Sequence, residues 1–227
     1  KGRKKEGFKR IKFTTQLLIF SSTLFLHSAF PQQSNLSKAV NHISSYIASE
    51  RFIELKIDVG DLPATDSIFI TALKFTKNEC SEALLALSAA TLPYREVPIV
   101  IPVIKSVWNY PLVSSSDSVY NFKNKNLPSR FFYDTPLNDY GDKDKLAHFF
   151  GFAFLSFSTL FFDLGNLIGY FTEAFEEDFK VQSSIDYRDL EVNFLGKCFG
   201  KLLKEDKSIL PSQVLVMRTL YYFGNPL

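Results

Sequence analysis

The sequence predicts an α+β fold that is mainly helical, with short strands confined to its N-terminal half. Three observations lead to this expectation: a basic and apolar leader, two strand-like stretches before residue 113, and apolar residues that recur with a helical period beyond residue 142. The expected organisation is an export signal or membrane anchor at 1–30, a mixed helix and strand region at 31–113, an irregular strap or linker at 114–141, and a helical region at 142–227.

The leader has the order of a secretory signal. Residues 1–12 hold seven Lys or Arg and one Glu, and the 14 residues 17–30 carry no charge. A basic segment, a short apolar segment and then a polar break at 31–33 are typical of export. If the segment is retained, residues 13–30 reach the lower limit of length for a membrane helix. We therefore expect the rest of the chain to be exported, whether or not the leader is cleaved.

Charge and aromatic content narrow the class of partner. The formal net charge is +2, but residues 1–12 contribute +6, which leaves a weakly acidic body of −4. This distribution argues against nucleic acid as the main partner. The 24 Phe and ten Tyr are more than a chain of 227 residues buries easily. We expect some of these rings at a surface that contacts a membrane or another protein.

The first half is expected to mix helices and strands. Residues 34–50 have the apolar spacing of a helix, and 66–91 read as a helix with a break near residues 78–80. Alternating apolar and charged residues predict a strand at 53–59 that ends at a glycine. The apolar run at 99–104 contains a proline and follows another, so it predicts an edge strand or extended arm.

The second half is expected to be helical after an irregular connection at 114–140. A Phe-rich helix is predicted at 144–162 and a second helix at 167–179, which together form a hairpin. A third helix is expected from the cap Asp186 to about Lys204. Pro211 opens a last helix that ends at Gly224.

Four residues of the expected third helix point to a close helix contact. Asp189, Asn193, Gly196 and Gly200 are spaced four, three and four apart, so they lie on one stripe. Glycines on a stripe allow another helix to approach closely. Asp189 and Asn193 then face the same helix and need polar partners there.

The first two helices supply candidate partners, since Asp144 and His148 share a face of the first and Glu173 lies on the second. We predict a polar cluster at a crossing of three helices, formed by His148, Glu173, Asp189 and Asn193, with Asp144 and Lys145 at its rim. The cluster is interpreted first as a structural lock between helices. The candidate catalytic residues, should it be a site of catalysis, are His148, Glu173 and Asp189.

Metal binding is a third interpretation of the cluster. With only three His in the chain, one of them inside the leader, a multi-histidine site is not expected, and we expect neither a metal ion nor a cofactor. The motifs of serine hydrolases, P-loop proteins and HExxH metalloproteases are absent from the sequence. Cys80 and Cys198 can either pair or remain two isolated thiols.

Three motifs in a fixed order carry a resemblance to known families. They are D-K-x-x-H at 144–148, a helix with Gly169 and Glu173, and D-x-x-x-N-x-x-G-x-x-x-G at 189–200. This order resembles the VanZ-like and YfiM-like envelope families over residues 142–204. The chain departs from both, because its apolar helices are shorter than those of a VanZ-like membrane bundle and no lipobox cysteine precedes Cys80.

The resemblance implies a component of a bacterial envelope, in the periplasm or associated with the outer membrane. We expect a membrane-associated, non-enzymatic accessory or structural subunit that contacts the membrane surface or another envelope protein through exposed aromatic side chains. The alternative is an envelope enzyme that acts on a lipid-linked or peptidoglycan substrate, with His148 and Glu173 as its acid–base pair.

Overall fold

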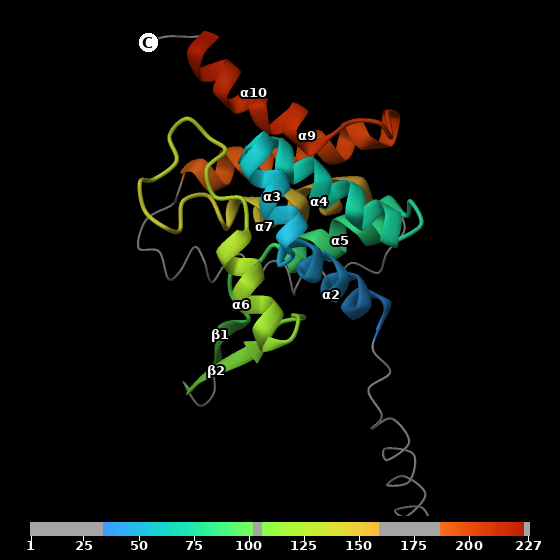
Figure 1. The fold of residues 1–227 in the computed structure, drawn as a ribbon, viewed down its shortest axis with the longest axis vertical. Helices are drawn as coiled ribbons and strands as arrows, with labels where there is room; N and C mark the ends of the chain where they lie inside the picture. Colours follow the sequence, from blue (N-terminus) through green and yellow to red (C-terminus); the bar gives the residue numbers. More distant parts are fainter. Residues whose placement is uncertain (1–33, 102–105, 159–186, 225–227) are drawn as a thin grey trace, which may run out of the picture. The chain divides into compact units, whose positions relative to one another are not determined.

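The computed structural model of the chain describes residues 34–101, 106–158 and 187–224, and Figure 1 shows their arrangement. These residues form eight α-helices and one pair of antiparallel strands. The helices are α2 (Asn35–Ile47), α3 (Glu50–Val59), α4 (Asp61–Phe75), α5 (Cys80–Ala90), α6 (Asp117–Asn126), α7 (Lys145–Ser158), α9 (Tyr187–Glu205) and α10 (Pro211–Gly224). The strands are β1 (Glu96–Ile101) and β2 (Ser106–Pro111). All of them belong to one compact unit that begins at Asn35, and α10 and the hairpin lie at opposite ends of it (Figure 1).

The expected α+β fold is wrong, because the described part is built from helices. The stretch 53–59, whose alternating pattern predicted a strand, lies in α3. Ser49 caps this helix by accepting a hydrogen bond from the backbone N–H of Phe52 at 3.3 Å, and Gly60 ends it with a φ of +84°. The β1–β2 hairpin covers part of the expected arm at 99–104, but it is a two-stranded ribbon without further strands among the described residues. It therefore does not make a mixed half.

Most of the predicted helices are confirmed. Residues 34–50 contain α2, and 66–91 contain most of α4 and all of α5, with Lys77 and Asn78 in the left-handed region at the break. The third and last predicted helices correspond to α9 and α10, and the first corresponds to α7 as far as Ser158. The leader and the second predicted helix, 167–179, lie outside the described residues.

The core is one cluster of buried side chains that α2, α4, α5, α7, α9 and α10 contribute. α7 packs against α5 and α9, and α4 packs against α5, α2 and α10. Three aromatic contacts join these helices: the ring centroid of Phe69 lies 6.5 Å from that of Phe150 and 5.3 Å from that of Phe199, which is 5.2 Å from that of Phe149. The Phe-rich pattern of α7 thus serves the core, since nearly every side chain of its first two turns is buried.

The expected irregular strap contains a helix, α6, and is held to the body by the side chains of Lys123, Lys56 and Asp61, of which Lys123 is buried. Lys123 donates from Nζ to the carbonyl of Leu92 at 2.5 Å, and Lys56 donates to the carbonyl of Asn126 at 2.8 Å. Further along, Asp61 accepts hydrogen bonds from the backbone N–H groups of Ser129 and Arg130, both at 2.7 Å. These hydrogen bonds satisfy backbone N–H and carbonyl groups that have no partner within a helix or a sheet.

Among the described helices, none has both the length and the apolar character that crossing a bilayer requires.

Candidate functional site

The close helix contact that the glycines predict lies between α9 and α7. A Cβ atom added to Gly196 would lie 2.3 Å from the carbonyl oxygen of Phe149, and one added to Gly200 would lie 2.3 Å from that of Ala153. Both distances are too short for any side chain. Because Phe149 meets Gly196 and Ala153 meets Gly200, the two helices run in the same direction.

The polar residues of both helices gather one turn before this contact. The side chain of Lys145 donates to Asp144 Oδ2 at 3.0 Å and to Asp189 Oδ1. The ring atom Nδ1 of His148 lies 3.1 Å from Asn193 Oδ1, and since this oxygen only accepts, the ring donates Nδ1–H. On its other side, His148 Nε2 lies 4.0 Å from Asp189 Oδ1. All five side chains belong to residues that are at most 6 % exposed.

The arrangement brings together most of the predicted cluster and corrects two positions. His148, Asp189 and Asn193 meet between α7 and α9, as the stripe argument predicts. Asp144 and Lys145 were expected at the rim, but both are buried, and Lys145 joins the carboxylates of Asp144 and Asp189 at the centre. Glu173 lies outside the described residues.

The carboxylates of Asp144 and Asp189 differ in their hydrogen bonding, because Asp189 Oδ1 accepts from Lys145 whereas one oxygen of Asp144 accepts from no described residue. Oδ1 of Asp144 is buried without a hydrogen-bond partner among the described residues. Burial raises the pKa of Asp144 above its ordinary value, and the neighbouring Lys145 ammonium opposes part of this effect. Two carboxylates thus share one ammonium, and the Asp144 carboxyl is the one that burial pushes toward its neutral form.

Asp144, His148 and Asp189 also offer the kind of ligands that a divalent metal binds. Their ligand atoms lie within 4.8 Å of one another, and all three residues are buried. The Lys145 ammonium, however, already bonds to both carboxylates. A metal ion added there would meet a positive charge inside its own ligand shell. With Lys145 charged, the cluster is an ion-pair network and a poor metal centre.

A second network, which nothing in the sequence indicates, lies next to the first. Asp142 is fully buried and accepts hydrogen bonds from the backbone N–H groups of Phe131 and Phe132 and from Arg188. Asp134 forms an ion pair with Arg188, with 3.3 Å between Oδ2 and Nε, and accepts hydrogen bonds from both terminal nitrogens of Arg218. These bonds tie the strap to α9 and α10. Their members lie in polar stretches of ordinary composition, where spacing gives no signal.

The two cysteines are separate thiols and do not form a disulfide. Cys80 is buried, with its Sγ atom 3.8 Å from the Lys207 ammonium, and Cys198 is half-buried on α9.

No family model matches the chain, and no match is found among curated proteins or among solved structures. Function must therefore be inferred from the chemistry of the chain itself.

Proposed function

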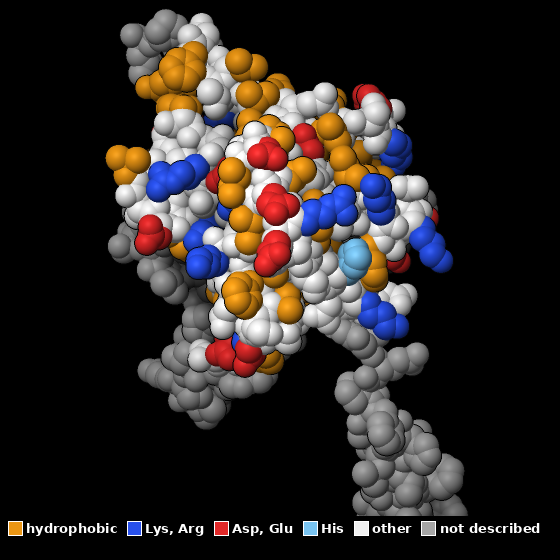
Figure 2. Space-filling model, in the orientation of Figure 1, with side chains coloured by type: hydrophobic (Ala, Val, Ile, Leu, Met, Phe, Trp, Pro, Cys, Tyr) orange, Lys and Arg blue, Asp and Glu red, His pale blue; other side chains and the backbone are white. Residues whose placement is uncertain are grey.

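We propose that this chain is an exported, membrane-associated protein of a bacterial envelope and that it acts as a non-enzymatic accessory or structural subunit. The observation that carries the proposal is the aromatic end of α10. Four consecutive residues there are exposed to between 50 and 75 %: Leu220, Tyr221, Tyr222 and Phe223. Figure 2 shows hydrophobic side chains gathered over this end of the molecule.

The four residues occupy consecutive positions, which determines what they can bind. Successive residues of a helix point about 100° apart, so four of them surround the helix and cannot all pack on one face of the body. Tyr133 stacks on Tyr222, with 4.1 Å between ring centroids, and thereby extends the aromatic surface onto the strap. An apolar surface of this kind is typical of contact with a membrane or another protein.

The polar cluster supports an accessory role over a catalytic one. His148 is 1 % exposed and Asp189 is 4 % exposed, and both are engaged by neighbours from the facing helix. A general acid or base must come within hydrogen-bond reach of a substrate. The cluster instead has the arrangement of a lock, in which Lys145 bonds to Asp189 and His148 bonds to Asn193 across the α7–α9 contact.

Cell fractionation tests the location. The full chain is produced in a Gram-negative host together with a variant that lacks residues 1–33. We expect the full chain in the membrane fraction, protected from protease until the outer membrane is opened, and the shortened variant in the cytoplasm. A full chain that remains unprocessed and freely soluble in the cytoplasm would refute the proposal.

Two substitutions test the aromatic surface within the same experiment. Tyr221→Ser combined with Phe223→Ser should move the exported protein from the membrane fraction to the soluble periplasmic fraction. Phe122→Ser is the matched control, because Phe122 is 59 % exposed on α6, away from this surface. Equal membrane retention of both variants would contradict a role for the end of α10.

A further inference from the structure

The outward side of α9 carries one continuous stripe of exposed side chains. The residues follow spacings of three and four, which keeps them on one side of a helix. In order they are Tyr187, Leu190, Phe194, Lys197, Lys201 and Lys204. Gly196, which contacts α7, lies opposite Tyr187, and the stripe approaches the α7 side only toward its end, where Lys204 follows Gly200 by four residues. The α9 stripe is therefore apolar in its first half and basic in its second.

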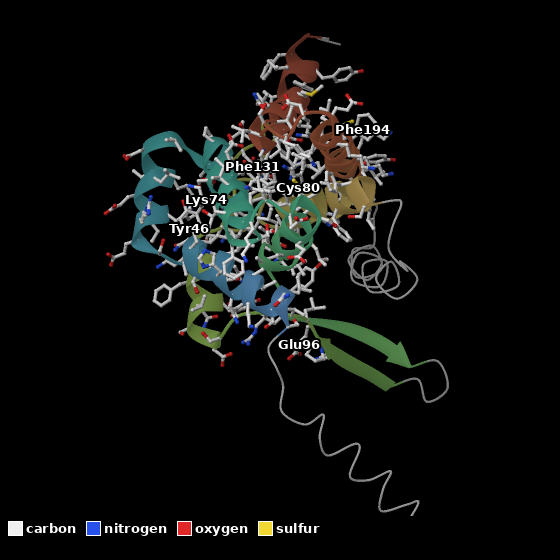
Figure 3. All side chains as sticks on the ribbon, turned by 90° about the vertical axis from the view of Figure 1, so that its right-hand side faces the viewer. Tyr46, Lys74, Cys80, Glu96, Phe131 and Phe194 are labelled. Carbon is white, nitrogen blue, oxygen red and sulfur yellow. The ribbon has the colours of Figure 1, made fainter. Side chains whose placement is uncertain are left out.

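The apolar half projects from the body. Tyr187 is 77 % exposed, Phe194 is 65 % exposed and Leu190 is 45 % exposed. Phe194 lies at the outer side of α9, far from Lys74 on α4 (Figure 3). Large rings at such exposure leave apolar area in water unless a partner covers them.

The basic half consists of three exposed lysines. Lys197 lies over the ring of Phe152, with its Nζ atom 5.3 Å from the ring centroid, and this contact leaves its charge in place. Among the described residues of α9, Glu191 and Glu205 border the stripe. The carboxylate of Glu191 accepts a hydrogen bond from Arg218 Nε at 2.6 Å, and Glu205 is exposed at the last position of α9. Lys197, Lys201 and Lys204 are all exposed, so this half of the stripe presents basic side chains at the surface.

We propose that the α9 stripe binds the surface of an anionic phospholipid membrane, with α9 lying parallel to the bilayer plane. This inference rests on the membrane association proposed above and names the helix face and the lipid class. Leu190 and Phe194 enter the boundary between headgroups and acyl chains, Tyr187 lies at headgroup level, and the lysines contact lipid phosphates.

The size and order of the stripe favour a lipid over a protein partner. A stable protein interface needs about 20–30 residues on each side, whereas the apolar half has three large side chains. A membrane supplies the remaining attraction through its charge, because phosphates are spread over a plane and meet every lysine of a straight row. Long lysine stems let the ammonium groups reach that plane while the rings insert beside them.

A site-specific fluorescence experiment tests the proposal and separates α9 from the leader. The single Trp of the full chain, Trp108, is replaced by Phe, and a new Trp is introduced either as Phe194→Trp or, as a control, as Phe122→Trp. Both sites are exposed aromatic positions. Vesicles containing brominated phosphatidylglycerol should quench the Trp at 194 strongly and the Trp at 122 weakly. Circular dichroism checks that both variants are folded.

Charge variants then test the lipid class. Lys197→Gln with Lys201→Gln should weaken vesicle binding at least tenfold at physiological salt, since each lysine near an anionic surface contributes about a fivefold factor. Lys74→Gln with Lys125→Gln, which changes two exposed lysines outside the stripe, should leave binding within twofold. Equal quenching at 194 and 122, or equal quenching by zwitterionic vesicles, would overturn the proposal. Cytoplasmic location in the fractionation experiment would instead refute the proposed function, whatever the vesicles show.

Discussion

Lys145 on α7 donates a hydrogen bond to the carboxylate of Asp189 on α9, 44 residues further along the chain. The same ammonium bonds to Asp144, and all three side chains are buried. Breaking a buried ion pair from one side leaves charge without a partner in a medium of low dielectric constant, so the loss exceeds what the pair itself contributes. The contact therefore predicts how the fold responds to substitution.

Lys145→Met should lower the free energy of unfolding by about 3–5 kcal/mol at pH 7, because two carboxylates are then left buried without the ammonium. Urea unfolding followed by circular dichroism measures the change. The deficit relative to wild type should shrink as the pH falls toward 4, where the stranded carboxylates take up protons. Lys74→Met, at an exposed position, should change stability by less than about 0.5 kcal/mol. A similarly small effect of Lys145→Met would contradict the lock.

Gly200→Ala should destabilise the protein although alanine is the better helix former by about 1 kcal/mol. The new Cβ would lie 2.3 Å from the Ala153 carbonyl oxygen, and that atom belongs to the backbone of α7 and cannot rotate away. We expect a loss of about 2–3 kcal/mol, measured by thermal unfolding. Gly224→Ala is the matched control, because a Cβ there meets nothing within 4 Å. Equal melting temperatures for the two variants would argue against close packing of α7 and α9.

Lys123 predicts a rise in stability with pH. Burial lowers its pKa from 10.5 to about 7. Between these values the unfolded chain holds a proton that the folded chain has lost, so the free energy of unfolding increases as the pH rises through this window. From pH 7.5 to 9.5 the contribution should approach about 2 kcal/mol. Lys123→Met should remove this slope, whereas Lys125→Met, at an exposed position of the same helix, should retain it. If the free energy of unfolding rises equally with pH in wild type and in Lys123→Met, the proton of Lys123 is not the cause of the rise.

Asp134 predicts a sensitivity to acid. Burial alone would raise the pKa of this carboxyl, but the hydrogen bonds from Arg218 and the charges of Arg188 and Arg218 outweigh it and hold the pKa below its ordinary value. A depressed carboxyl pKa contributes stability that is present above about pH 4 and is lost as the pH falls through the folded value. Asp134→Asn should therefore weaken the protein at pH 7 and flatten the acid limb of its stability curve. An unchanged acid limb, followed by tryptophan fluorescence, would mean that other carboxylates control acid unfolding.

How far the sequence predicts the fold depends on which signal dominates locally. The glycine stripe predicted the close contact of α9 because only a short backbone-to-backbone distance explains Gly196 and Gly200 at that spacing. The alternating pattern at 53–59 wrongly predicted a strand. The short exposed helix α3 buries only Phe52 and places no constraint on the pattern of its other residues. Local capping by Ser49 and Gly60 decided the structure there.

The sequence predicted which residues form the polar cluster better than it predicted how they are arranged in it. His148, Asp189 and Asn193 follow from the stripe and from the need of buried polar groups for partners. The central place of Lys145 does not follow, because a lysine at the start of a helix usually reaches solvent. Nothing in the sequence indicated that Lys123 and Asp142 are buried, because their burial depends on how the strap folds over distant elements.

The shared direction of α7 and α9 has an electrostatic consequence. Two helices that run the same way bring their N-termini side by side, and the positive ends of their macrodipoles then repel each other. Asp144 directly precedes α7 and Asp189 lies in the first turn of α9, so each helix has a carboxylate at its positive end. Reversing one helix would move its acid to the negative end of the other. The two acids thus favour one relative orientation of the helices, a directional role that a purely apolar contact between them would lack.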